Sequence, residues 1–260
     1  MAGKAIVMGA TSGIGMEVAK LLAKQGWQVG IAGRRIERLE TVKRSQDGIV
    51  CCQQIDVTAA DAPDRLMKLI DGLGGMDLYF HSSGIGWQND SLDMDKELRT
   101  VETNALGFVR MVDTAFNWFA ERECSAASYD KAATAGRPSL CRIACITSIA
   151  GTKGLGAAPA YSSTKRFQSH YLECLAQQAR MRRLNISITD LRPGFVKTDL
   201  IAGSGYPLQL DAKDVAEGMV KAIGKGRRVK VFDWRYAILV FFWRLVPGWV
   251  WTRMRVSKCK

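Results

Sequence analysis

The sequence lacks several features that would assign it to common classes of protein. Its seven cysteines are an odd number, and no two of them form the Cys-x-x-Cys pair that zinc and redox sites use. We therefore expect reduced thiols and no metal site, as in a cytosolic protein. The first apolar strand begins by about Lys4, which leaves no room for the charged and apolar regions of a signal peptide. These features predict a cytoplasmic location.

Acidic residues are nearly absent from the C-terminal end. Residues 221–260 hold eleven Lys or Arg against the single acid Asp233, a balance of +10, so the first 220 residues carry only +2 of the total +12. A strongly basic chain often binds nucleic acid. Because the charge is confined to one end, we instead assign it to a separate task of the tail and expect no nucleic-acid partner.

The tail also lacks the length of apolar sequence that spans a bilayer. Its uninterrupted apolar run, Tyr236–Trp243, has eight residues, and a membrane-spanning helix needs about 20. Aromatic residues flanked by arginines are typical of helices that lie in the membrane interface. Residues 233–260 are therefore predicted to dock at an anionic membrane surface as two short helices bent at Pro247-Gly248, which would make the protein peripheral at the inner face of a membrane. The alternatives are that the tail packs over the substrate pocket or against a second subunit.

In this interpretation the tail's tryptophans enter the membrane and its arginines lie at the level of the head groups. The expected inserting residues are Trp243, Trp249 and Trp251, and the expected head-group residues are Arg235, Arg244, Arg253 and Arg255.

With 260 residues, 47% of them hydrophobic, the chain can bury the core of one open α/β domain, although two small domains are an alternative. The apolar strand Ala5–Met8 is followed by a glycine-rich turn and then by a helical pattern. This order predicts a phosphate cradle, because glycines let the backbone approach and a helix N-terminus favours an anion. A plain strand-to-helix turn is the other interpretation. The residues of the predicted cradle are Gly9, Thr11, Ser12, Gly13, Ile14 and Gly15.

The second predicted strand, Trp27–Ala32, ends where a dinucleotide fold contacts the adenosine ribose. An NAD site would place a carboxylate there, but this chain has Arg34 and Arg35. Two guanidinium groups without an adjacent acid favour the 2′-phosphate of NADP(H), which is the predicted cofactor. Alternatively, the two arginines only begin a solvated helix.

Acid–base chemistry is indicated by Ser148, Tyr161 and Lys165. Tyr161 and Lys165 are four residues apart, about one helical turn, so the ammonium can lie near the phenol. A phenol titrates near pH ~10, and we expect Lys165 to lower the pKa of Tyr161 by stabilising the phenolate. Ser148 follows the predicted strand Ile143–Ile146, so its hydroxyl could meet the same substrate oxygen. A chance spacing on a surface helix is the alternative.

Further apolar runs predict the remaining elements. A helix with an apolar stripe indicates core or subunit contact, residues 121–138 are predicted as a surface loop, and residues 195–211 as a mobile lid. The other predicted strands are Ile49–Ile55, Met76–Phe80, Ile186–Leu191 and Val229–Phe232. The stripe consists of Phe108, Met111, Val112, Ala115 and Phe119.

Taken together, the motifs GATSGIG, DVT, YSSTK and RPGFVKT, with Asn104 and Ser148 in order between them, resemble the short-chain dehydrogenase/reductase family. The resemblance extends from Gly9 to about Phe232. It implies a single doubly wound Rossmann domain over residues 1–232, with a seven-stranded parallel sheet, followed by an amphipathic extension over residues 233–260.

The resemblance also implies roles for individual residues. Tyr161 would be the acid–base residue, while Lys165 would lower the pKa of Tyr161 and hold the nicotinamide ribose. Ser148 would polarise the carbonyl, and Asn104 would anchor a water relay behind the lysine. The implied cofactor contacts are Gly9, Gly13 and Gly15 at the pyrophosphate, Asp56 and Val57 at the adenine, and Gly84, Pro193, Gly194, Val196 and Thr198 near the nicotinamide.

One segment departs from the family pattern. The family usually has Asn-Asn-Ala-Gly after the fourth strand, whereas this chain has His81-Ser82-Ser83-Gly84, so only the glycine is kept. We interpret His81 as a strand-end residue bonded to its neighbours and not as a catalyst.

The predicted function is that of an NADP-dependent oxidoreductase that reduces a hydrophobic, lipid-like ketone or oxidises the corresponding alcohol. The alternative is a binding or sensor protein that keeps the fold without the chemistry. Together with the outer face of the Tyr161 helix, the apolar stripe also suggests a homodimer formed by a helix bundle.

Overall fold

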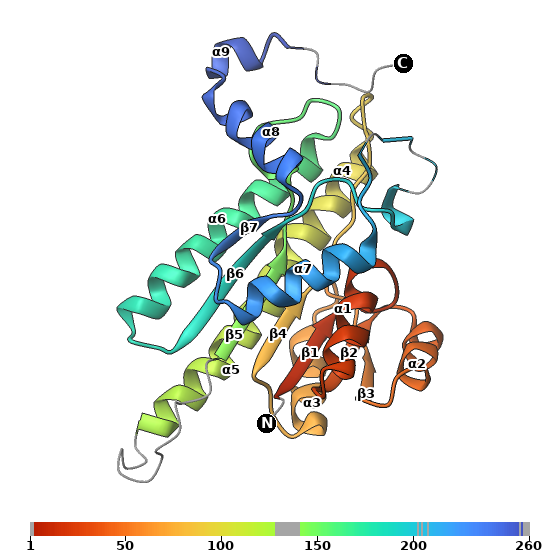
Figure 1. The fold of residues 1–260 in the computed structure, drawn as a ribbon, viewed down its shortest axis with the longest axis vertical. Coiled ribbons are helices and arrows are strands. Elements are labelled where there is room, and N and C mark those ends of the chain that lie inside the picture. The colour runs from red at the N-terminus through yellow and green to blue at the C-terminus, as the bar shows by residue number, and fades with distance from the viewer. Residues whose placement is uncertain are drawn as a thin grey trace.

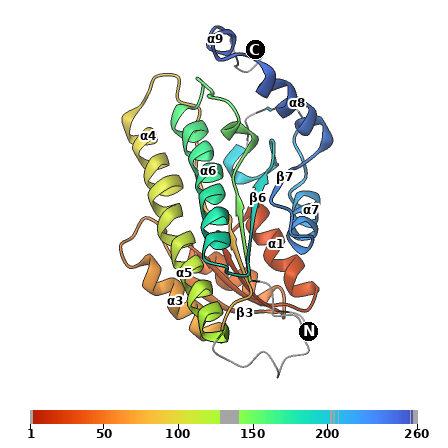
Figure 2. The ribbon, with the colours of Figure 1, turned by 90° about the vertical axis from the view of Figure 1, so that its left-hand side faces the viewer.

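In the computed structural model, a single parallel sheet is covered by helices on both faces (Figures 1 and 2). The structure describes residues 3–127, 141–201, 203, 205–206, 208–254 and 256. The order of the strands is β3-β2-β1-β4-β5-β6-β7, which is the doubly wound arrangement that the sequence predicts. The strands are β1 (Lys4–Met8), β2 (Gln28–Gly33), β3 (Ile49–Gln54), β4 (Leu78–His81), β5 (Cys141–Ile146), β6 (Ile186–Arg192) and β7 (Val229–Val231).

Two apolar layers hold the sheet between its helices. One layer packs β1, β4 and β5 against α3, α5 and α6, and the other packs the opposite face against α1, α2 and α7. The central strands are buried on both faces, which explains why they are continuous apolar runs. The helices are α1 (Gly13–Lys24), α2 (Ile36–Arg44), α3 (Ala62–Leu73), α4 (Met94–Val101), α5 (Phe108–Ala127), α6 (Pro159–Met181), α7 (Ala212–Gly224), α8 (Trp234–Leu245) and α9 (Gly248–Trp251), with short turns η1 (Glu102–Gly107), η2 (Ile149–Gly151) and η3 (Asp199–Ile201).

All seven predicted strands are present, with ends displaced by at most two residues. The displacement reaches two residues in β4, which begins at Leu78 and not at Met76, and in β5, which begins at Cys141 and not at Ile143. The prediction of a loop from residue 121 is wrong as far as residue 127, because α5 continues to Ala127. The rest of that predicted loop lies outside the described residues.

The apolar stripe of α5 lies in the core and not on a surface. Its five residues are completely buried within the single chain and pack against α3, β4 and α6. Most exposed positions of α6 are polar, including Arg166, His170 and Glu173. The prediction that these two faces form a dimer contact is therefore wrong, because the stripe of α5 is buried in the core of the subunit and the outer face of α6 is hydrophilic. The homodimer itself stays a prediction.

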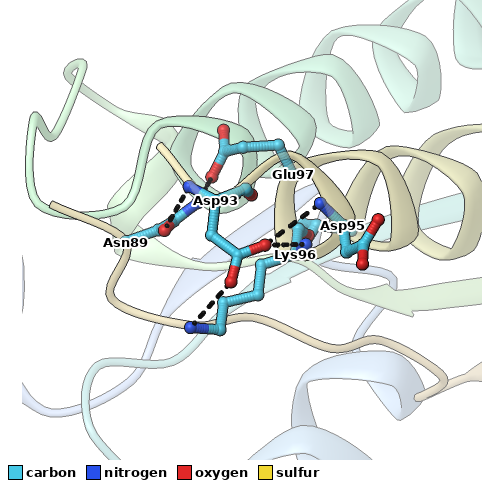
Figure 3. A network of polar contacts seen from close by, with 6 residues as sticks. Asn89, Asp93, Asp95, Lys96 and Glu97 are labelled. Atoms are coloured by element: carbon cyan, nitrogen blue, oxygen red, sulfur yellow. Dashed lines mark hydrogen bonds and ion pairs between the residues drawn. The ribbon is translucent and has the colours of Figure 1, made fainter. Parts of the chain in front are cut away.

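A polar network fixes the start of α6 (Figure 3). Asp93 caps α4 by accepting hydrogen bonds from the amides of Asp95 and Lys96, while the buried Asn89 side chain donates to Glu97 Oε1 at 2.7 Å. The other oxygen of Glu97 accepts a hydrogen bond from the amide of Ala160 at 3.0 Å. A carboxylate at this position satisfies one of the free amides of the α6 N-terminus and complements the helix dipole. It therefore anchors the turn that carries Tyr161.

The tail folds as the predicted pair of short helices, α8 and α9, separated at Pro247-Gly248. It packs against its own catalytic domain: Tyr236 and Val240 are buried against Ile149 and residues of the lid base. No helix among the described residues is long and apolar enough to cross a membrane.

Two of the three tryptophans predicted to insert into a membrane instead make contacts within the protein. Trp251 is buried and donates from its indole to the Gly154 carbonyl at 2.7 Å, and Trp243 packs edge-on against Trp251. The prediction is wrong for these two side chains, because α9 folds back onto the loop before α6. Trp249 is exposed, and Arg255 lies outside the described residues.

The buried position of the stripe has a measurable consequence. Phe108→Ala should lower the free energy of unfolding by about 3–5 kcal/mol, since it removes a fully buried ring and leaves a cavity. Phe167→Ala on the exposed side of α6 is the matched control, with an expected loss below about 1.5 kcal/mol. Urea unfolding of both variants measures the difference. If Phe108→Ala were as stable as the wild type but had a lower mass in solution, the stripe would instead belong to a subunit interface.

Candidate active site

The glycine-rich turn lies at the point where the strand order reverses. β1 pairs with β2 on one side and β4 on the other, so the turn after β1 is at the crevice where open α/β sheets bind ligands. Gly9 has a φ of +87°, and an added Cβ would lie 2.7 Å from the Ser83 amide nitrogen. Only glycine fits there. The turn and the start of α1 therefore present a close-approach backbone surface suited to a pyrophosphate.

Arg35 joins this turn to the end of β2. Its guanidinium donates to the hydroxyls of Thr11 at 2.8 Å and Ser12 at 3.1 Å. The Arg34 side chain is exposed and has no hydrogen bond or ion pair among the described residues. The sequence shows no acid next to these arginines, but the fold brings Asp199 to within 3.4 Å of Arg38 and 4.0 Å of Arg35. The basic site is therefore already partly compensated by one exposed carboxylate.

The predicted proton donor and its partners meet at the carboxyl end of β5. Ser148 follows β5, and its side chain lies near enough to the phenol of Tyr161 on α6 to act on it as a hydrogen-bond partner. Burial raises the pKa of Tyr161, and the hydrogen bond with Ser148 offsets this only in part. The direction is opposite to the lowering by Lys165 that we expected, since the ammonium lies 5.8 Å from the centre of the phenol ring and is engaged elsewhere.

Lys165 is held by groups that the sequence analysis did not identify. Its ammonium donates to the Ile146 carbonyl at 3.1 Å and to Gln168 Oε1 at 2.9 Å. The amide of Gln168 in turn donates to the Asn104 carbonyl at 2.8 Å. A direct side-chain bridge thus joins lysine and asparagine where the resemblance implied a water relay. Burial lowers the pKa of Lys165 to about 8, with the nearby Cys145 and Asp190 acting in the opposite direction.

Asn104 belongs to a π-helical turn, η1, between α4 and α5. Its side chain accepts from the Ile85 amide at 2.9 Å and donates to the Ile85 carbonyl at 2.7 Å. A π turn places an extra residue in the helix and is frequent at functional sites. The Asn104 carbonyl of this turn accepts the hydrogen bond from Gln168.

His81 is a buried strand-end residue, as interpreted from the sequence. Its Nδ1 and the Tyr79 hydroxyl are 3.0 Å apart, and its Nε2 has no partner among the described residues. Burial, together with the smaller effect of the charge of Lys165, lowers the pKa of His81 to about 3. A neutral imidazole at this position adds no second positive charge beneath the lysine.

The remaining predicted contacts line the same edge of the sheet. An added Cβ on Gly84 would lie 3.3 Å from Asn104 Oδ1, and one on Gly13 would lie 3.1 Å from Thr198. The Pro193 carbonyl accepts from the amide of Ile149, which ties the loop after β6 to the one after β5. Gly194 and Val196 belong to that loop. Asp56 bonds to Thr58, and Val57 is buried against Gly107.

Gly86 is a further residue of the site that the sequence analysis missed. A Cβ at this position would collide with the ring of Tyr161. The only sequence signal is its position two residues after Gly84. Among the described residues there is no cluster of His, Cys, Asp or Glu that could hold a metal ion.

Comparison with known proteins agrees with this geometry. The family model described as short chain dehydrogenase matches residues 3–205. The chain belongs to this family. It is 28% identical over 252 residues to an uncharacterized oxidoreductase of Myxococcus xanthus (strain DK1622), covering 94% of this chain and 92% of the relative. It is also 28% identical to the farnesol dehydrogenase of Aedes aegypti, covering 89% of this chain and 94% of that one.

Solved structures confirm the fold of this short-chain dehydrogenase. The actinorhodin polyketide ketoreductase with NADPH has a TM-score of 0.73 at 22% identity, and the match covers 89% of this chain and 95% of the ketoreductase. The 3-ketoacyl-(acyl-carrier-protein) reductase from Brucella melitensis complexed with NADH has a TM-score of 0.72 at 20% identity, over 88% of this chain and 94% of the other. At such identities the likeness establishes the Rossmann fold alone. The family assignment makes the chain an oxidoreductase.

The Gln168 bridge generates a prediction about pH. Gln168→Met removes an acceptor from the ammonium of Lys165, so the pKa of Lys165 should fall below about 8. The loss of carbonyl reduction that follows deprotonation of Lys165 as the pH rises should then begin about one pH unit lower than in the wild type. Gln168→Glu places a negative charge beside the ammonium and should move the same decline to higher pH. The pH profile of kcat/KM for a test ketone measures both shifts.

Gln178→Met, an exposed position on the same helix, is the matched control and should leave the profile unchanged. A purely structural role for Gln168 would lower the rate in both variants without displacing the profile in opposite directions.

Proposed function

We propose that this protein is an NADP-dependent reductase of hydrophobic, lipid-like ketones, or the dehydrogenase of the corresponding alcohols. The observation that supports this most directly is the meeting of Ser148, Tyr161 and Lys165 at the carboxyl end of β5, beside the glycine-rich turn. A bound nicotinamide supplies or accepts the hydride. The side chains of the protein supply the proton and the orientation.

Tyr161 acts as the proton donor when a carbonyl is reduced. Burial raises its pKa, so the phenol is protonated at neutral pH, which is the state that a general acid needs. Ser148 lies within hydrogen-bonding reach of the phenol and polarises the same carbonyl oxygen. The ammonium of Lys165, 5.8 Å from the centre of the phenol ring, attracts the phenolate that is left, although burial dominates the pKa of Tyr161.

The residues at the adenosine end fit a nucleotide with a 2′-phosphate. The backbone of the turn permits close approach at Gly9, and Arg34 and Arg35 follow β2 with their guanidiniums exposed. Arg35 already holds Thr11 and Ser12, so it organises the turn, while the Arg34 side chain has no partner in the described part of the chain and can bind a phosphate. The carboxylate of Asp199 repels a 2′-phosphate at this position. Its ion pairs with Arg35 and Arg38 are exposed and therefore weak.

A hydrophobic substrate is supported by an aromatic cluster that joins the site through Ile149, the residue after Ser148. Phe195 stacks on Tyr206 at 4.0 Å between ring centres, and Tyr236 packs edge-on against Phe195. Ile149, adjacent to Ser148, belongs to the same apolar cluster. The farnesol dehydrogenase of Aedes aegypti, a relative at 28% identity, acts by its name on a lipid-like alcohol. We therefore expect apolar ketones to be better substrates than polar ones.

Cofactor preference is tested by fluorescence titration with NADPH and NADH. Arg34→Ala should weaken NADPH binding about tenfold or more and leave NADH unchanged, since one charge-assisted hydrogen bond contributes roughly 1.5–3 kcal/mol. Arg35→Ala should weaken both cofactors, because the turn loses its bonds to Thr11 and Ser12. Asp199→Asn should strengthen NADPH binding. Arg44→Ala, at the far end of α2, is the control; equal affinities of wild-type protein for both cofactors would rule out the preference.

The chemical step is tested by Tyr161→Phe. The variant should bind NADPH as the wild type does and lose 10²–10⁴-fold in turnover of a hydrophobic ketone found by screening NADPH oxidation, since only the acid is removed. Ser163→Ala, an exposed position on the same helix, is a control expected to keep full activity. More than about a tenth of the wild-type rate in Tyr161→Phe would exclude this tyrosine as the acid. Wild-type protein that binds NADPH but turns over no carbonyl or alcohol would favour a sensor protein.

A further inference from the structure

α8 is apolar on two opposite faces, and only one of them is used by the protein. The inner face carries Tyr236 and Val240, which are buried on the catalytic domain. The outer face carries four large apolar side chains at intervals of four, three and four residues, so they form one line along the helix. Their exposed fractions lie between 48% and 71%, and they are Trp234, Ile238, Phe241 and Leu245.

We call this line of four side chains the outer face of α8. Figures 1 and 2 show α8 and α9 at one end of the molecule, beyond the carboxyl edge of the sheet. Phe242, which packs edge-on against Phe241, is also more than half exposed, as is Trp249 on α9. Single exposed apolar residues are common, but a contiguous group of this size marks an interaction surface.

The charges around the outer face select its partner. Arg235 and Arg244 lie about a quarter-turn to either side of the line, given roughly 100° of rotation per residue. Arg253 packs over Trp249. Residues 233–260 hold six Lys or Arg against Asp233 alone, a balance of +5, while the other five basic residues of the last forty precede or belong to β7. Asp233 accepts two hydrogen bonds from the Arg235 side chain, so Arg244 and Arg253 carry most of the uncompensated charge of the described tail.

We propose that the outer face of α8 docks the protein on an anionic lipid surface, with Trp234, Ile238, Phe241 and Leu245 entering the interface and Arg244 and Arg253 meeting the head groups. Apolar burial and attraction to anionic lipids then act together. A second copy of the chain suits this face less well, because the identical tail holds a single acid, Asp233, which is already paired with Arg235 and so offers Arg244 and Arg253 no opposite charge. The proposal does not depend on the cofactor or the substrate.

Docking is tested with full-length protein and sedimenting vesicles of phosphatidylcholine, alone or with phosphatidylserine. The protein should sediment with the anionic vesicles, less with the neutral ones, and less again when salt is raised from about 0.05 M to 0.5 M. The double variant Ile238→Ser/Phe241→Ser should lower vesicle binding about tenfold or more, since it removes two inserting side chains. The matched control is Val50→Ser/Met181→Ser, which removes two exposed apolar side chains away from the tail and should bind as wild type.

Arg244→Glu provides a second variant that leaves the apolar face intact and should lower binding to anionic vesicles about fivefold. Circular dichroism and NADPH titration should show that all variants are folded. Wild-type protein that stays in the supernatant with every lipid would overturn the proposal, as would undiminished binding by folded Ile238→Ser/Phe241→Ser. A lipid-free dimer that this double variant converts to a monomer, in sedimentation velocity, would also overturn it and assign the face to a second subunit.

Discussion

The buried ammonium of Lys165 is the constraint around which the carboxyl edge of the sheet is arranged. A charge removed from water costs several kcal/mol unless hydrogen bonds compensate it. The carbonyl of Ile146 and the amide oxygen of Gln168 provide that compensation, and Gln168 is itself held by the Asn104 carbonyl. Each partner comes from a different element, β5, α6 and η1. The cation therefore fixes the relative position of three segments, and the neutral His81 avoids adding to its charge.

Much of this arrangement could be predicted from sequence because its signals are local. Apolar runs predicted all seven strands, and the motif residues Ser148, Tyr161 and Lys165 lie together as expected. Gln168 also had a local signal, since a residue three positions after Lys165 shares its helical face. Contacts between distant segments had none: Asp199 meets Arg38 across 161 positions, and Glu97 reaches Ala160 across 63.

The tail shows a different limit of sequence reasoning. Periodicity assigns a buried side only when a helix has a polar face to oppose the apolar one. α8 is apolar almost all round, so composition identified an interaction segment without indicating which tryptophans face inward. The structure resolves this by contacts: α9 folds back and buries Trp251 on Gly154, while Trp234 remains outside. α5 does have a polar face, with Arg110, Asp113 and Asn117, so periodicity identified its apolar stripe but could not show whether the stripe packs in the core or against a second subunit.

Tyr236 of α8 also closes the base of the lid. Its hydroxyl donates to the Leu208 carbonyl at 3.0 Å and accepts from the Phe195 amide at 3.3 Å, and its ring occupies the space that a side chain on Gly194 would need. Together with the bridge between Val196 and Leu210, this holds the two ends of the lid at a fixed separation. The entropy cost of closing this loop is therefore met when the chain folds. The tail follows the last strand of the sheet, yet through Tyr236 it is a structural part of the loop that borders the site.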